Sequence, residues 1–320
     1  MYRYRAIVAT VFAFFAASIF AQDYPTKPVR IIISFTAGGT TDVIGRKIAE
    51  RLTTIWKQPV VVENKPGAGG TLGTDYIVTQ PPDGYTLLMA SPGPMVISPL
   101  LPKKLLTDPL TAVVPVILVA DVANVLVVPP ESGIKSMDEL VKRAKAAPGT
   151  MNYGSTGVGT VAHLSGAQWS YLMGIETVHV PYKGAGAVTD LMGGRIQFMF
   201  ATLPSVVGQI KGGKLKAIGQ VAQRRFKALP DVPTMKELGV QGMENGSWFG
   251  LFVVKGTPQP IIDKINSQVN AILKEKEVQD FLDQNGADGV GGSPQDYARI
   301  IKTDLETWAP VIKRANVQAD

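Results

Sequence analysis

The 320-residue sequence contains no cysteine and only two histidines. Without thiols the chain can form no disulfide or thiolate metal site, and it has no cysteine nucleophile or cysteine for lipid attachment. A histidine cage for a metal ion is nearly excluded, because His163 and His179 are the only members available for it. The absence of cysteine also suits a chain that passes through an oxidising compartment. The sequence thus predicts neither a metal nor a disulfide framework.

The chain also lacks a concentrated basic surface. Its formal net charge is +6, but the basic residues are dispersed, and Arg224-Arg225 is the densest basic spot. Nucleic-acid binding needs a clustered basic face, so we expect no nucleic-acid partner. A mild positive charge favours encounter with small anions instead.

Long apolar stretches are missing except at the start of the chain. Arg3 and Arg5 precede the uncharged run Ala6–Phe20, and the small residue Ala21 follows it. This pattern is typical of a secretory signal peptide, and the run is short for a membrane-spanning helix. We therefore expect a signal peptide over residues 1–21, cleavage near Ala21 and export; an uncleaved anchor is the alternative.

The rest of the chain alternates apolar, β-branched runs with helical patterns. The runs Val29–Phe35, Val60–Glu63 and Tyr85–Met89 predict buried strands with helices between them. In the first of these helices the apolar residues Ile44, Ile48, Leu52 and Ile55 are expected to share one face. A βαβαβ order favours a parallel, doubly wound sheet.

A second unit of similar character begins near Val122. Further strands are predicted at Asn124–Val128, Met151–Gly154, Thr177–Val180, Gln197–Phe200, Ala217–Val221 and Trp248–Val254. A chain of this length favours two domains, and no linker composition separates them. The predicted fold is α/β, with two doubly wound domains and a ligand cleft between them. The expected division is residues 22–122 plus about 248–292 for the first domain, 123–247 for the second, and 293–320 for a C-terminal helix packing back across both.

Three glycine-rich turns each connect a strand to a helix. They are Phe35-Thr36-Ala37-Gly38-Gly39-Thr40-Thr41-Asp42, Pro66-Gly67-Ala68-Gly69-Gly70-Thr71 and Gly154-Ser155-Thr156-Gly157-Val158-Gly159-Thr160. Glycine lets the backbone approach a ligand, and the free N–H groups at a helix start bind anions without a charged side chain. One such turn is usually only a tight connection, but three in one chain favour an anion site.

Nucleotide-binding and hydrolase motifs are absent from these turns. None of the turns ends in the Gly-Lys-Ser/Thr of a P-loop, and Leu72 replaces the third glycine of a dinucleotide fingerprint. No Gly-x-Ser-x-Gly elbow occurs either. We therefore expect no cofactor and no catalytic residues.

Other candidate residues have two interpretations each. His163, just after the third glycine turn, is either a buried histidine bonded to backbone or a ligand contact. Tyr182 and Lys183 end a strand, where they would either be solvated or supply a hydroxyl and a cation to a carboxylate. Phe35 and Phe249, at strand ends, are either core residues or pocket walls.

A set of motifs spread from Tyr24 to the C-terminus resembles one family. The motifs are Tyr24-Pro25-x-Lys27-Pro28-x-Arg30, Gly38-Gly39-x-x-Asp42, residues 62–70 (VENKPGAGG), Asp83-Gly84-Tyr85, Gly157-x-Gly159-Thr160-x-x-His163-Leu164, residues 180–184 (VPYKG), residues 229–234 (LPDVPT), Trp248-x-Gly250 and Gly256-Thr257-Pro258. In this combination the chain resembles the Bug-type receptors of tripartite tricarboxylate transport systems.

The resemblance implies a monomeric, two-domain periplasmic binding protein that closes around a small organic acid anion. It also implies a membrane transporter of one large and one small integral subunit as partner. In this family one ligand carboxylate is typically held by the first and third glycine turns. The expected ligand-binding residues are Phe35, Thr36, Ala37, Gly38, Gly39, Thr40, Asp42, Ser91, Ser155, Thr156, Gly157, Thr160, His163, Tyr182, Lys183, Gly184, Ala201, Thr202 and Phe249.

One departure from the family pattern bears on the ligand. Where many relatives carry Asp-Asn, this chain has the neutral pair Ala201-Thr202, which removes a carboxylate that could face an amino group. The expected ligand is therefore a carboxylate without an ammonium group. A dicarboxylate is favoured and an aromatic acid such as terephthalate is allowed, while Asp42 would weaken the argument if it faced the cleft. An enzyme or sensor component on the same scaffold, such as a hydrolase, is the alternative function.

Overall fold

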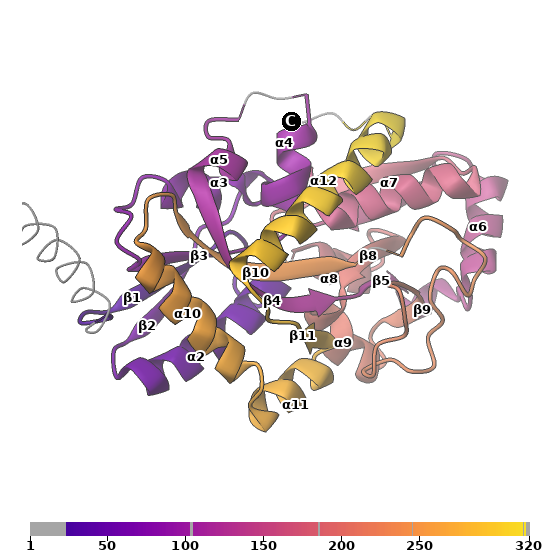
Figure 1. Cartoon of the computed structure of the whole chain (residues 1–320). Helices are drawn as coiled ribbons and strands as arrows, with labels where there is room; N and C mark the ends of the chain where they lie inside the picture. The colour runs from indigo at the N-terminus through magenta and orange to yellow at the C-terminus, as the bar shows by residue number, and fades with distance from the viewer. Residues whose placement is uncertain (1–23, 103–104, 185, 245, 316, 318–320) are drawn as a thin grey trace, which may run out of the picture.

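The fold consists of two α/β domains that meet along one side of each sheet (Figure 1). The computed structural model describes residues 24–102, 105–184, 186–244, 246–315 and 317. The expected signal peptide lies outside the described residues. Among the described helices none combines the length and apolar character needed to cross a membrane.

The first domain contains a six-stranded sheet of order β11-β4-β10-β3-β1-β2. Its strands are β1 (Val29–Ile33), β2 (Val60–Asn64), β3 (Thr86–Ala90), β4 (Val113–Val122), β10 (Ser247–Val254) and β11 (Ala287–Gly289). The three N-terminal strands pair in parallel, as the βαβαβ pattern predicts. The other three join antiparallel, so the whole sheet is mixed.

Helices cover both faces of this sheet (Figure 1). They are α2 (Thr40–Trp56), α3 (Thr71–Ile77), α4 (Ser98–Leu100), α5 (Pro109–Ala112), α10 (Gln259–Ile272) and α11 (Lys276–Gln284), with short turns η1 (Ala68–Gly70) and η2 (Gly93–Ile97). On α2 the prediction for Ile55 is wrong: Ile55 is 39% exposed, and Trp56 is buried in its place. At 100° per residue Ile55 falls within the stripe of Ile44, Ile48 and Leu52, so helical periodicity alone does not account for its exposure in the last turn of α2.

The second domain contains a five-stranded sheet of order β7-β6-β8-β5-β9. Its strands are β5 (Asn124–Val128), β6 (Met151–Ser155), β7 (Thr177–Pro181), β8 (Phe198–Thr202) and β9 (Lys216–Val221). Its helices are α6 (Met137–Ala146), α7 (Val161–Met173), α8 (Gly186–Met192) and α9 (Leu203–Lys211), with the short turn η3 (Pro130–Ser132). The strands β7, β6 and β8 pair in parallel, and Thr156 and Thr202, at the ends of β6 and β8, line a cavity together with residues of the first domain.

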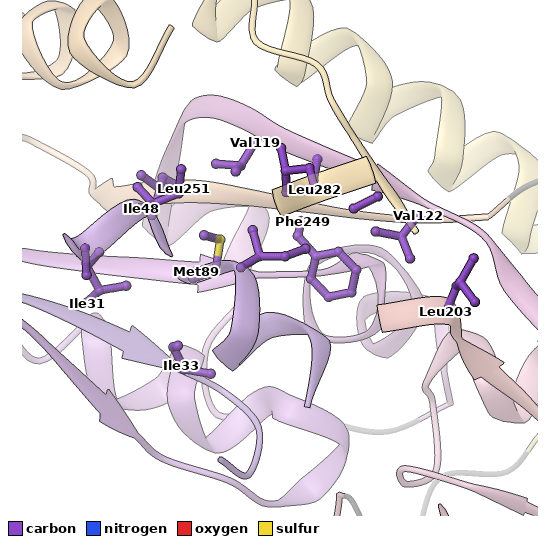
Figure 2. Close-up of a cluster of buried hydrophobic side chains, with 14 of the residues drawn as sticks. Ile31, Ile33, Ile48, Met89, Val119, Val122, Leu203, Phe249, Leu251 and Leu282 are labelled. Carbon is purple, nitrogen blue, oxygen red and sulfur yellow. The ribbon is translucent and has the colours of Figure 1, made fainter. Parts of the chain in front are cut away.

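Two adjacent chain segments connect the domains. The chain leaves the first sheet after Val122 and returns at Ser247, and the Asn124 side chain donates a hydrogen bond to Ser247 Oγ at 3.1 Å. One apolar cluster continues through this region; in the view of Figure 2 the Phe249 ring lies between Met89 and Leu203. Helix α12 (Pro294–Ala315) runs without interruption through Pro310 and packs on both β4 and α7. The boundaries given for the two domains stay a prediction.

Candidate functional site

A cavity of about 210 Å³ lies where the two domains face each other. This is below the 300–1,000 Å³ of pockets for drug-sized ligands, which favours a small solute. The lining residues are Phe35, Thr36, Gly38, Gly39, Thr40, Thr41, Ser91, Gly93, Thr156, Thr160, Val161, Ala162, Gly184, Val188, Thr189, Met192, Met199, Thr202, Ser205, Gln209, Ser247 and Phe249. None of these described residues carries a charge.

The first glycine turn brings the N-terminus of α2 to the cavity. Gly39 is the N-cap and offers no side-chain acceptor, so the N–H groups of Thr40 and Thr41 keep no intrahelical partner. The two glycine N–H groups are already engaged: Gly38 donates to Asp42 Oδ2 at 3.0 Å, and Gly39 donates to the Thr36 carbonyl at 3.3 Å. The available donors are therefore Thr40, which the sequence predicted as a ligand-binding residue, and its neighbour Thr41.

Asp42 points away from the cavity and supports this turn from behind. Besides Gly38, it accepts hydrogen bonds from Arg46 Nε at 2.9 Å and from Asn64 Nδ2 at 2.9 Å. Burial would raise the pKa of Asp42, but these hydrogen bonds outweigh burial and hold the pKa below its usual value. Asp42 is thus an ionised structural acceptor and does not line the cavity.

The third glycine turn brings the N-terminus of α7 to the same cavity. Thr160 is the N-cap: its Oγ1 accepts the His163 N–H at 3.4 Å and donates to the Gly157 carbonyl at 2.8 Å. The N–H groups of Val161 and Ala162 precede the first intrahelical bonds, and both residues line the cavity. Two helix N-termini, one from each domain, therefore direct N–H groups and the positive ends of their dipoles into one uncharged space.

A direct hydrogen bond joins the two domains across this space. The hydroxyl groups of Thr40 and Thr202 lie 2.6 Å apart, and either could donate. Thr202 lines the cavity, whereas its neighbour Ala201 is fully buried in the core. The pair Ala201-Thr202 is therefore neutral, and its cavity-lining member, Thr202, is already bonded to the opposite domain.

The remaining cavity wall is largely apolar. Phe35 and Phe249 both line it, so they are pocket walls as well as neighbours of the core, while Met89 and Trp248 are buried away from it. Sequence reasoning missed Thr41, Gly93, Val161, Ala162, Val188, Thr189, Met192, Met199, Ser205, Gln209 and Ser247. Thr41, Val161 and Ala162 could have been predicted from the sequence, because they lie at the helix starts that follow the glycines of the two turns.

Several expected residues line a second chamber instead. This chamber of about 340 Å³ includes Gly157, Tyr182 and Lys183 and shares Phe35, Thr36, Thr156 and Gly184 with the cavity. The Tyr182 hydroxyl donates to Asp190 at 2.8 Å, and Lys183 is exposed. A side chain at Gly184 would collide with Thr36, so glycine is required where the two spaces meet.

The last expected residues lie outside both spaces. Ala37 is exposed on the first turn. Ser155 and His163 are buried behind the third turn, where His163 Nδ1 accepts the Gly159 N–H at 3.3 Å. Among the described residues no cluster of acidic or histidine side chains could hold a metal ion.

Comparison with known proteins identifies the family of this chain. The family model described as "Tripartite tricarboxylate transporter family receptor" matches residues 44–317. The chain belongs to this receptor family. It is 36% identical over 309 residues to BugT from Bordetella pertussis, covering 95% of this chain and 94% of BugT.

Solved structures of other members agree in fold. The protein described as "R. palustris Rpa4515 with adipate" has a TM-score of 0.90 at 33% identity and covers 92% of this chain and 99% of its own. MatC from Rhodopseudomonas palustris, with bound malate, has a TM-score of 0.85 at 29% identity and covers 90% of this chain and 100% of its own. The predicted two-domain α/β fold and the predicted Bug-type receptor family are confirmed. The protein is a solute-binding receptor of a periplasmic family and not an enzyme.

Proposed function

We propose that this receptor captures a small organic carboxylate without an ammonium group, with a dicarboxylate favoured, and delivers it to a membrane transporter. The observation that carries the proposal is that two helix N-termini, from α2 and α7, open into one uncharged cavity. Such termini bind anions through backbone N–H groups and helix dipoles.

The lack of a carboxylate in the cavity argues against an amino-acid ligand. An ammonium group enclosed here would find only hydroxyl, amide and carbonyl groups among the described lining residues, and burying an unpaired charge is costly. Asp42 follows the cavity-lining residues Thr40 and Thr41, but its carboxylate already accepts hydrogen bonds from Gly38, Arg46 and Asn64.

A dicarboxylate would use both donor sets. The N–H groups of Thr40 and Thr41 belong to one domain and those of Val161 and Ala162 to the other, so two anionic ends would hold the domains together. The relatives whose structures contain adipate and malate support the same class. Phe35 and Phe249 would flank an apolar or aromatic middle.

Calorimetric titration with matched acids tests the ligand class. We expect succinate to bind more tightly than aspartate by at least tenfold, and terephthalate to bind more tightly than benzoate. Tighter binding of aspartate than succinate would overturn the no-ammonium proposal. Recovery of each acid unchanged after incubation distinguishes a receptor from an enzyme.

A matched pair of variants sharpens this test. Thr202→Asp places a carboxylate in the cavity and should lower succinate affinity by more than tenfold while reducing the discrimination against aspartate. Thr202→Asn has similar size without the charge and serves as the control. If both variants favour succinate over aspartate as strongly as the natural protein does, charge at this position does not set the ligand class.

Export and delivery follow from the same proposal. We propose that residues 1–21 are a cleaved signal peptide, and that the membrane partner has one large and one small integral subunit. The N-terminus of the protein recovered from the periplasm should lie near Ala21 or Gln22; recovery of Met1 would contradict cleavage.

A further inference from the structure

A pair of histidines, His163 buried and His179 half-buried, lies behind the ligand cavity. The rings of His163 and His179 stack in parallel, with centroids 3.7 Å apart and planes within 6°. His163 lies in the first turn of α7, and His179 lies in the middle of β7. These are the only histidines in the sequence.

Both rings are bonded to the third glycine turn, one at each end. Near the C-terminal end of the turn, His163 Nδ1 accepts the Gly159 N–H at 3.3 Å. Near its N-terminal end, His179 Nε2 lies 2.7 Å from Ser155 Oγ. Ser155 Oγ in turn accepts the Gly157 N–H at 3.1 Å and donates to the Gly157 carbonyl at 3.0 Å.

Counting protons assigns the tautomers of both rings. With the single hydroxyl proton of Ser155 directed to the Gly157 carbonyl, His179 Nε2 is the donor to Ser155 Oγ. His163 Nδ1 is an acceptor, so its proton is on Nε2. A second proton on His163 would remove the acceptor of the Gly159 N–H and place a charge against the stacked ring.

The surroundings of His179 favour a neutral ring. On β6, Tyr153 packs against both rings, with centroids 5.0 Å from His179 and 6.5 Å from His163, and burial raises the pKa of Tyr153 so that it stays neutral. Burial, followed by the neighbouring His163, lowers the pKa of His179 to about 3. A closely stacked pair that is hydrogen-bonded to both ends of the turn resists rotation of that turn.

We propose that His163 and His179 are a positioning pair that holds the third glycine turn, and with it the α7 N-terminus, in the geometry that binds the ligand anion. The inference rests on the proposed function, since the positioned groups are the N–H groups of Val161 and Ala162. The side chains act through the turn and do not touch the ligand.

Nitrogen-15 NMR of the ligand-free protein is the first test, because every histidine signal comes from this pair. We expect both rings in the neutral Nε2–H form at pH 7 and His179 still neutral at pH 5. A protonated His179 at pH 5, or an Nδ1–H tautomer at His163, would overturn the proposal. This readout needs no ligand, so it separates failure of the positioning pair from failure of the proposed function.

The second test compares His163→Leu with His163→Asn, using adipate as the probe in calorimetry. Asparagine offers an oxygen near the position of Nδ1, whereas leucine offers no acceptor for Gly159. We expect His163→Leu to weaken adipate binding at least tenfold and to shift the amide signals of Val161 and Ala162 without ligand; His163→Asn should stay within about threefold of the natural protein. Equal amide spectra for leucine and natural protein, or equal losses for leucine and asparagine, would contradict the proposal. If His163→Leu does not fold, the proposal is tested by adipate binding to His163→Asn and by the NMR signals of the histidine rings at pH 7 and pH 5.

Discussion

The first and third glycine turns present the same kind of donor to the cavity but are supported by different chemistry. Behind the first turn, the ionised Asp42 bonds to Gly38, Arg46 and Asn64. Behind the third turn, the support is neutral and consists of Ser155, Thr160 and the histidine pair. Backbone N–H groups can therefore be held for an anion by a charged network or by an uncharged one. The two kinds of support should differ in their response to mutation and pH.

The largest expected effect comes from removing the charged support. Asp42→Ala leaves the Gly38 N–H, Arg46 and Asn64 without their shared acceptor, and the loss of a buried, charged hydrogen-bond partner should cost about 2–3 kcal/mol of unfolding free energy. Urea denaturation measures it. Arg46→Gln is the control: Arg46 is 53% exposed, so its ion pair should contribute below about 1 kcal/mol. Equal losses in the two variants would refute the role assigned to buried Asp42.

The next expected effect concerns the contact between the second and third glycine turns, which pack directly on each other. A Cβ at Gly69 would collide with the Val158 carbonyl across the two domains. Gly69→Ala should therefore keep the domains apart and weaken succinate binding at least tenfold, or about 1.4 kcal/mol. Gly174→Ala introduces comparable strain, at φ 59° against 62°, with no atom nearby. Similar affinity of both variants would show that this contact does not control closure.

The smallest effect is in pH dependence, and it separates the two supports. The pKa of His179 in the fold, about 3, is below the ordinary histidine value of 6.5, so the unfolded chain binds more protons between these values. Stability from this group is present above pH 6.5 and is lost as pH falls toward 3. Between pH 7 and 5 the natural protein should lose about 1 kcal/mol more than His179→Gln, after allowing for partial exposure of the ring.

The Asp42 contribution behaves differently in the same experiment. Its pKa is lowered in the fold, so its stabilisation is present above about pH 4 and is lost only below that value. Urea midpoints of the two variants at pH 7 and pH 5 should therefore show a pH-dependent difference for His179→Gln and none for Asp42→Ala. The opposite pattern would contradict the assignment of the two supports.

The three parallel strands of the N-terminal unit could be predicted because their apolar runs are continuous. Strand β4 was missed: Pro115 interrupts its pattern, and the structure accommodates the proline beside a shift in register against β10. The apolar wall was missed for another reason. Met192 and Met199 line the cavity only because α8 and β8 present those particular side chains to the first domain, and local sequence does not encode that choice.

The two glycine turns were identified from sequence, and Thr40 was expected to bind the ligand, but Thr41, Val161 and Ala162 were not. Glycine marks the turn, whereas the free N–H groups belong to the helical residues after it. For His163 the sequence left two interpretations open, a buried histidine bonded to backbone and a ligand contact. The hydrogen bond from the Gly159 N–H and the stacking on His179 agree with the first.

A crystal structure with bound succinate would test the central claim most directly. We predict carboxylate oxygens within hydrogen-bond distance of the N–H groups of Thr40 or Thr41 and of Val161 or Ala162, directly or through one water, with no charged side chain in contact. A carboxylate paired with Lys183 in the second chamber, and the two helix N-termini left without an anion, would contradict it.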